Sequence, residues 1–264
     1  MKACVYHQIA IKSIATHALF TGAMALFFLL SGCASGPNAN PRDPLEPFNR
    51  GVSRFNDVVD KAILKPAATA YVKVTPALAR TGVRNFFSNL GDAWSAVNSA
   101  LQFKAQDAAE NWMHFSVNTV FGLGGLLDVA GEIDIPRHKE DFGRTLGRWG
   151  VPAGPYLVLP LLGPSTVRDA FALPVDAKGN LIRDVHPTVD RNSLYVLEAL
   201  SLRANLLRAS SVLDDAALDK YSFTRDIFLQ VRGAKIGDGP DSDMEQNPAS
   251  PNQNLPLFKW NTPR

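Results

Sequence analysis

Cysteine is scarce in this chain, and the usual signatures of catalytic and metal centres are missing. Cys4 and Cys33 are the only two cysteines among 264 residues, so the chain after them offers no thiol for a disulfide or a zinc site. Neither the His-Glu-x-x-His motif of zinc proteases nor the Gly-x-Ser-x-Gly motif of many hydrolases occurs. We therefore expect a protein that is not an enzyme and that uses no metal and no cofactor.

Two residues could still suggest a hydrolase that acts on lipids, but each has a simpler explanation. Ser165 lies in a Gly-Pro-Ser-Thr stretch and is expected to cap a helix that begins at Thr166. His138 precedes three charged residues, a run typical of a solvated surface. A nucleophile would also need a base and an orienting group, and the sequence indicates neither.

The chain has almost no excess of either charge. Its formal net charge is +2, and the only charged residues among the first 32 are Lys2 and Lys12. Without them the chain holds equal numbers of basic and acidic side chains, 25 of each. This balance gives no support to nucleic-acid binding.

No apolar run is long enough to cross a membrane as a helix. The longest, 18–30, has 13 residues against the roughly 20 of a spanning helix, and it follows a basic start. It ends in Leu-Ser-Gly-Cys33, which resembles the lipobox of bacterial lipoproteins, in which the cysteine is acylated. An ordinary signal peptide with a chance cysteine is the alternative. We expect a signal peptide over 1–32 and a firm lipid anchor at Cys33.

Composition sets the remaining boundaries. Residues 33–42 form a polar tether, 43–232 form one folded domain, and 233–264 are rich in Pro, Asn, Asp and Ser, which is typical of disorder. By resemblance to lipoprotein sorting in Gram-negative bacteria, Ala34 after the cysteine favours the periplasmic face of the outer membrane.

Helical periodicity dominates the folded region. Apolar residues recur at steps of three and four over 48–63, 83–101, 194–207 and 218–231, and a further helix is expected over 106–121. Pro66 is expected to end the first of these segments. Alternating strand patterns are scarce, so the predicted fold class is mostly all-α.

The polar faces of two of these helices carry very little charge. Asp92 is the only charged residue over 85–103, and Lys, Arg, Asp and Glu are all missing from 111–127. An ordinary amphipathic helix places Lys and Glu on its wet side. Either these helices are buried, with Asn and Ser bonded to the backbone, or their weakly polar side lines a passage. The candidates for such a lining are Asn98, Asn111, His114 and Asn118.

Glycines surround a short apolar stretch at 121–132. Tight turns and hinge-like movement are both possible there. The stretch is no dinucleotide fingerprint, because its third glycine is misplaced and no strand precedes it. It is either a plain turn or a mobile hairpin that gates a passage, and its key residues are Gly122, Gly124, Gly125, Asp128 and Gly131.

A second apolar segment, 154–169, is interrupted by three prolines. It is too broken to form a continuous helix and too apolar for an ordinary exposed loop. We expect its first part, 154–164, to lie on a surface that faces lipid, with its free backbone groups directed toward protein or a passage.

Several of these stretches together resemble one known family. DPLEPFNR (43–50), NFFSNL (85–90), NTVFGLGGLLDVAG (118–131), DFGRTLGRWGVPAGPYLVLPLLGPSTVRD (141–169) and the lipobox are similar to the MlaA family, also called VacJ. The resemblance implies a ring of amphipathic helices lying in one membrane leaflet around a central channel, with the glycine-flanked hairpin loop controlling it. Phe48 and Asn49 are then expected either to brace the ring or simply to pack.

The resemblance also implies a function. Members of the family are outer-membrane lipoproteins that remove mislocalised phospholipids from the outer leaflet and pass them to a soluble periplasmic lipid carrier (MlaC-like), often beside trimeric porins. We expect the same of this chain, with phospholipid as its cargo and no nucleic-acid partner. The alternative is a structural envelope lipoprotein that links porin or cell wall without moving lipid.

Overall fold

The computed structural model describes residues 40–234, and in this range the protein is built almost entirely from helices. Cys33, the predicted signal peptide and most of the predicted disordered tail lie outside the described residues. The helices are α2 (Glu46–Val59), the π-helix η2 (Asp60–Leu64), α3 (Lys65–Val74), α4 (Ala77–Leu101), α5 (Ala105–Val120), α6 (Val129–Glu132), α7 (Phe142–Arg148), α8 (Val167–Gly179), the 3-10 helix η3 (Leu181–Asp184), α9 (Thr188–Ala216) and α10 (Lys220–Ala234). The predicted all-α class is confirmed.

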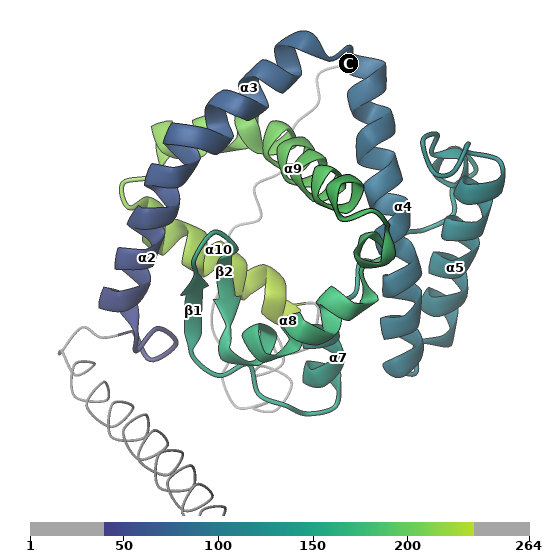
Figure 1. Ribbon diagram of the computed structural model, residues 1–264. Coiled ribbons are helices and arrows are strands. Elements are labelled where there is room, and N and C mark those ends of the chain that lie inside the picture. The colour runs from purple at the N-terminus through teal and green to yellow at the C-terminus, as the bar shows by residue number, and fades with distance from the viewer. Residues whose placement is uncertain (1–39, 235–264) are drawn as a thin grey trace, which may run out of the picture.

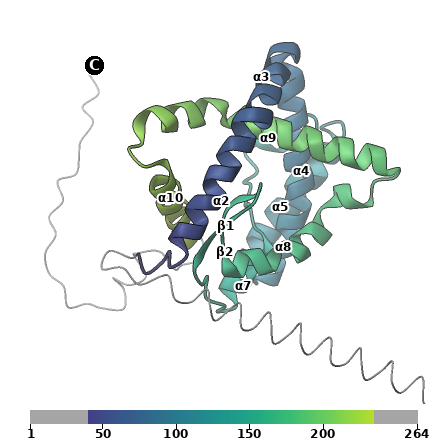
Figure 2. The same ribbon diagram turned by 60° about the vertical axis from the view of Figure 1, so that its left-hand side comes forward.

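The helices follow one another around a closed circuit (Figure 1). Helices α2, η2 and α3 run along one side, and α4 continues from the far end of α3. Helix α7 contacts α4, α8 packs on α7, and α8 contacts the two-stranded sheet, which returns to α2. Helix α9 packs against both α3 and α4, and α10 lies next to the sheet (Figure 2). Segments far apart in the sequence thus close the circuit.

The first helical segment does not end at Pro66, as its sequence predicted. The chain passes through η2 and continues as α3, with the proline in the first turn of that helix. A proline has no amide hydrogen to donate, and the π-helical turn lies directly before the helix whose first turn holds this proline. The result is one rod that extends from Glu46 to Val74.

The proline-interrupted segment forms a β-hairpin. Strand β1 (Tyr156–Leu159) pairs antiparallel with β2 (Gly163–Thr166), with Tyr156 opposite Thr166 and Leu159 opposite Gly163. Leu161 and Leu162 lie at the tip, 63% and 68% exposed. Strand β1 alternates between buried and partly exposed side chains, so Tyr156 and Val158 both point into the small apolar core that they form with Tyr221.

The long helices match the sequence pattern and the helix expected to begin at Thr166 is α8, whereas the short helices α6 and α7 were missed. Helices α4 and α5 cover the predicted segments, and α9 is longer than its apolar stripe. Helices α7 and α8 depend on caps: Asp141 accepts from the amide of Arg144, and Thr166 accepts from the amide of Asp169. Ser165 was wrongly expected to be the cap. Its hydroxyl donates instead to the carbonyl of Thr166. No helix within residues 40–234 combines the length and apolar character that membrane crossing requires.

Candidate functional site

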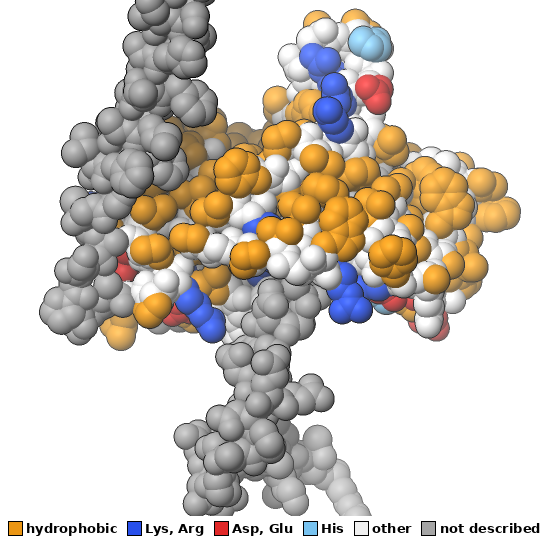
Figure 3. Space-filling view, turned by 90° about the horizontal axis from the view of Figure 1, so that it is seen from below, with side chains coloured by type: hydrophobic (Ala, Val, Ile, Leu, Met, Phe, Trp, Pro, Cys, Tyr) orange, Lys and Arg blue, Asp and Glu red, His pale blue; other side chains and the backbone are white. Residues whose placement is uncertain are grey.

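The distribution of polar and apolar side chains is inverted relative to that of an ordinary water-soluble protein. Within the described residues eight hydrophobic residues are buried, whereas eighteen polar or charged residues are buried. Large apolar side chains lie outside instead, including Leu78 at 89% and Phe103 at 91% exposure. In Figure 3 the hydrophobic side chains gather in a broad band across the face, with charged groups mainly along its margins. Such a band suits contact with lipid. The polar side chains buried inside the protein, in turn, need hydrogen-bond partners.

Asparagines of α2 hold the free edge of the sheet. The Asn49 Nδ2 donates to the carbonyl of Tyr156 at 3.0 Å, and its Oδ1 accepts from the amide of Val158 at 2.8 Å. Seven residues further along the helix, Asn56 bonds in the same way to the carbonyl of Leu159 and the amide of Leu161. The side-chain amides of Asn49 and Asn56 thus take the place of a neighbouring strand. They form hydrogen bonds with backbone groups that would otherwise lack partners at the edge of the sheet.

Asn49 also joins the start of the described chain to its last helix. Its Nδ2 donates to Asp43 Oδ1 at 2.8 Å, while Asp43 Oδ2 accepts from the hydroxyl of Tyr221 at 2.6 Å and from Arg225 at 3.2 Å. The Asp43 side chain is fully buried. This group of residues ties α2 to α10 and to β1, which agrees with a bracing role for Asn49. The second bracing candidate, Phe48, is 56% exposed and makes a poor internal brace.

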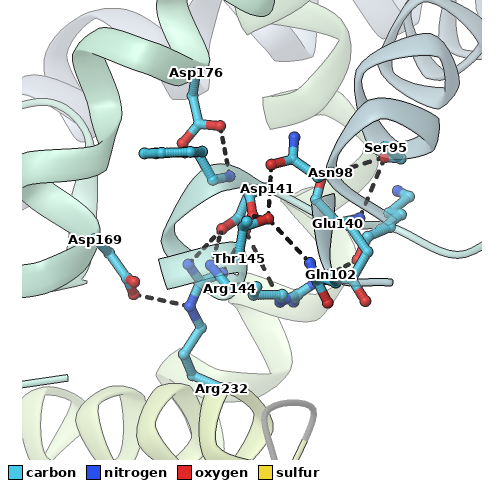
Figure 4. Close-up of polar contacts among 12 residues, drawn as sticks. Ser95, Asn98, Gln102, Glu140, Asp141, Arg144, Thr145, Asp169, Asp176 and Arg232 are labelled. Atoms are coloured by element: carbon cyan, nitrogen blue, oxygen red, sulfur yellow. Dashed lines mark hydrogen bonds and ion pairs between the residues drawn. The ribbon is translucent and has the colours of Figure 1, made fainter. Parts of the chain in front are cut away.

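A second ionic cluster joins α7, α8 and α10 (Figure 4). Arg232 binds both oxygens of Asp141 at 2.5 and 2.7 Å, and its Nε donates to Asp169 at 2.8 Å. Burial alone would raise the pKa of Asp141, but the hydrogen bonds and charge of Arg232 lower it. A Cβ at Gly143 would lie 2.5 Å from Asp169 Oδ1 and 2.7 Å from Arg232 Nη2, so only glycine leaves room for this cluster.

A chain of neutral polar groups connects this cluster to α4. The Thr145 hydroxyl donates to Asn98 at 2.8 Å and accepts from Gln102 at 3.1 Å. Ser95 accepts from the amide of Glu140 and donates to its carbonyl (Figure 4). The charges of the run after His138 suggested a solvated surface. Lys139 is indeed exposed, but Glu140 is bonded to α4 through its backbone and its side chain is largely buried.

The glycine-flanked stretch forms a series of turns followed by the single turn of α6, with no strand. Gly124 and Gly125 have positive φ angles of 72° and 94°, which glycine adopts without strain. A Cβ at Gly125 would lie 2.6 Å from the side-chain Nδ2 of Asn89, so the stretch packs closely on α4. Gly122 is equally constrained, since a Cβ there would lie 2.3 Å from the carbonyl oxygen of Leu127. In this structure the stretch is a packed turn, and whether it moves stays a prediction.

Buried charges lie directly beneath these turns. Asp92 Oδ1 is 3.1 Å from Arg137 Nε, and Asp92 Oδ2 is 3.1 Å from His114 Nδ1. Burial raises the pKa of Asp92 to about 6 and lowers the pKa of His114. Asp128 reaches the same group, 3.7 Å from Arg137. Burial would raise the pKa of Asp128, but the hydrogen bond from Asn118 and the charge of Arg137 together lower it.

The four candidates for a passage lining are all buried, with at most 2% of each exposed. Asn111 donates to the carbonyl of His138 and accepts from its amide, both at 2.8 Å. Asn118 accepts from the amide of Ala130 and donates to Asp128, also at 2.8 Å. Asn98 is bonded within α4 and to α7, and His114 contacts Asp92. They hold α4, α5 and the following turns together, so the expectation that they line an open passage is revised.

Two open hollows lie elsewhere, on the side of α4 that faces α9. One of about 330 Å³ lies between α4, the 139–140 segment and α9, and one of about 210 Å³ lies between α3, α4 and α9. Arg84, Ser201 and Asn205 line both. The sequence analysis missed them, because α9 is far from α4 in sequence and only the fold brings the two helices together.

One group of side chains has the composition of a weak metal site. His138 Nε2 lies 2.6 Å from Glu110, and Nδ1 lies 3.9 Å from Asp107. All three are partly exposed, and their donor atoms lie within 4.8 Å of one another. The hydrogen bond between His138 and Glu110 already accounts for their close approach, and no nucleophile lies in the cluster.

Comparison with known proteins gives consistent relatives. The family model for the MlaA lipoprotein matches residues 41–235. An uncharacterised protein of Rickettsia conorii is 42% identical over 74% of this chain and 78% of its own length. The intermembrane phospholipid transport system lipoprotein MlaA of Escherichia coli K12 is 34% identical over 83% of this chain and 89% of its own.

The fold leads to the same relatives. A solved structure, described as the structural basis for maintenance of bacterial outer membrane lipid asymmetry, has 34% identical residues and a TM-score of 0.61. The match covers 74% of this chain and 98% of the solved one. The family model covers all but one of the described residues, and the relatives match most of the chain. The chain belongs to the MlaA lipoprotein family.

Proposed function

We propose that this protein takes part in intermembrane phospholipid transport, as an outer-membrane lipoprotein anchored through Cys33. It removes mislocalised phospholipids from the outer leaflet and passes them through a channel within its circuit of helices to a soluble periplasmic carrier. Trimeric porins hold it in place. Lipid asymmetry of the outer membrane is the result.

The observation that carries this proposal is the inverted polarity of the molecule. Large apolar side chains cover the outside, as lipid contact requires, while between α4 and α9 a polar hollow adjoins a more apolar one. A phospholipid needs both environments, because its chains favour apolar contact by about 25 cal/mol per Å² whereas its headgroup does not. The names of the relatives in Escherichia coli and Haemophilus influenzae support phospholipid as the cargo.

No chemical step is required for such transport. The protein's own residues would lower the barrier to lipid movement by replacing water around the headgroup and lipid around the chains. The ionic clusters that join α2, α7, α8 and α10 keep the circuit closed while a lipid moves. A conduit of this kind depends on the rigidity of its wall.

A deletion strain tests this function. We expect phospholipid to accumulate in the outer leaflet, measured by palmitoylation of lipopolysaccharide or by sensitivity to detergent with EDTA, and full restoration by the wild-type gene. The Cys33→Ala variant should fail to restore asymmetry although it is expressed. If the strain instead shows normal asymmetry with envelope detachment or shape defects, the structural alternative is correct.

A further inference from the structure

The corner where α3, α4 and α9 meet contains a polar hollow of about 210 Å³. Its wall includes Tyr71 from α3, Arg80 and Arg84 from α4, and Ser201 from α9. Among the residues that line it there is no carboxylate. A hollow with two guanidinium groups, hydroxyl groups and no acid attracts an anion.

Several of these groups lack partners in the structure. The Tyr71 hydroxyl and Arg80 Nε are buried from solvent, and neither has a hydrogen-bond partner among the described residues. Neither Arg80 nor Arg84 forms an ion pair with a described side chain. Arg203, on α9, is paired by contrast, because it binds both oxygens of Asp60 at 2.6 and 2.8 Å. Buried donors without acceptors are rare, and here they favour an anionic ligand.

The neighbouring hollow of about 330 Å³ extends this site toward apolar surface. It shares Arg84 and Ser201 with the first and adds the side chains of Phe87, Trp94 and Leu202. The acidic residues of the region, Asp92, Glu140 and Glu198, line only this second hollow. An anion is therefore favoured at the α3 end, while an attached apolar group finds contacts along α4 and α9.

We propose that Arg80, Arg84 and Tyr71 bind the phosphate diester of a phospholipid, with its glycerol and the start of its acyl chains along Phe87, Trp94 and Leu202. The proposal rests on the proposed transport function and assigns it a headgroup site. Two guanidinium groups and one hydroxyl supply charge-assisted donors to the phosphate oxygens, which a diester offers whatever its headgroup. The ligand chemistry is a phosphate anion, and its source is a lipid because apolar lining adjoins it.

Direct binding measurements on the full-length, detergent-solubilised protein test the site. The probe is dihexanoyl phosphatidylglycerol, compared with dihexanoylglycerol, which lacks the phosphate, and with inorganic phosphate. The Arg80→Gln/Arg84→Gln variant should bind the phospholipid roughly tenfold to a hundredfold more weakly, with little change for dihexanoylglycerol. Arg54→Gln, on exposed α2 outside both hollows, is the matched control and should bind like the wild type.

Two further variants keep the test valid if the double variant does not fold. Tyr71→Phe removes only the hydroxyl, and Arg84→Gln alters an exposed side chain, so both should retain normal helical content and still bind the phospholipid severalfold more weakly. Arg80→Lys/Arg84→Lys keeps the charge and should recover part of the affinity.

The possible outcomes separate this site from the proposed function. Equal phospholipid binding by wild type and folded variants would overturn the site while leaving transport intact. A wild-type protein that binds no phospholipid at all would overturn both. If inorganic phosphate displaces the lipid at equal concentration, the site serves free phosphate, and the lipid assignment is wrong.

Discussion

The side-chain amide of Asn49, on α2, forms two hydrogen bonds with the backbone of β1. It donates to the carbonyl of Tyr156 at 3.0 Å and accepts from the amide of Val158 at 2.8 Å. A helix side chain thus takes the place of a β-strand neighbour. Because Asn49 also donates to buried Asp43, one side chain joins three parts of the molecule that are distant in sequence.

Truncation of Asn49 should therefore destabilise the protein strongly. Asn49→Ala leaves a buried carbonyl and a buried amide without partners, which costs about 1–3 kcal/mol for each group. Thermal unfolding in detergent, followed by circular dichroism, measures the loss. Phe48→Ala is the neighbouring control and should shift the unfolding midpoint little, because this side chain is half exposed. Equal shifts for the two variants would contradict the bracing role of Asn49.

Gly143 should tolerate no side chain. Gly143→Ala places a methyl group among Asp141, Asp169 and Arg232 and should break at least one ionic contact, with a loss of about 3 kcal/mol or more in unfolding free energy. Urea unfolding in mild detergent provides the measurement. Gly51→Ala, in α2 with no atom within 4 Å of the added Cβ, should be neutral or stabilise the helix by up to about 1 kcal/mol.

The buried carboxyl of Asp92 should make stability fall as the pH rises from about 4 to about 6. Its folded pKa of about 6 lies above the ordinary value of 3.8, so the folded state holds the proton more tightly in this window. Its contribution is greatest below the ordinary pKa and is lost as the pH rises through the folded pKa. His114 and Asp128, whose pKa values are lowered, act in the opposite direction.

A variant isolates the Asp92 contribution from these opposing groups. Asp92→Asn has no carboxyl to titrate, so it lacks the loss of stability that Asp92 causes as the pH rises. The difference in unfolding free energy between variant and wild type should therefore change steadily between pH 4 and pH 6. Above that range the difference should be constant. A difference that does not depend on pH would show that Asp92 titrates normally in the folded protein.

The tip of the β-hairpin should contribute to membrane contact. Leu162→Asp introduces a charge on an exposed apolar position and should reduce co-flotation with phospholipid vesicles severalfold, measured on protein that carries Cys33→Ser and so lacks the acyl anchor. Asn192→Asp adds the same charge at an exposed polar position of α9 and should leave co-flotation unchanged. Similar binding of both variants would place the tip away from lipid.

The sequence predicted the helices better than it predicted the interior. Apolar steps of three and four identify α4, because its apolar side chains gather on one face of the helix. They do not reveal which polar face is internal. The uncharged faces carrying Asn98, Asn111 and Asn118 permitted either a buried helix or a lined passage, and only the long-range contacts to α7 and to His138 decide for burial.

Other features depended on contacts that no local pattern contains. Asn49 and Asn56, seven residues apart, share one side of α2, but their common partner is a strand about 100 residues later. Similarly, Arg80 and Arg84 look like an ordinary pair on one helix face, and only the fold shows that they line a hollow together with residues of α9. Asp141 appeared as a member of a charged surface run, and its burial follows from Arg232 near the end of α10.

The inverted polarity changes which substitutions count as conservative. Outside, exchange of one aliphatic residue for another leaves an equivalent contact with hydrocarbon, so the shape of the side chain matters little there. Inside, replacement of an asparagine by glutamine preserves the chemistry but moves the amide by a methylene, and the amide of Asn49, for example, has three fixed partners. In this protein the internal amides are therefore the side chains whose geometry must be precise. In most globular proteins that requirement applies to apolar core residues such as leucine and valine.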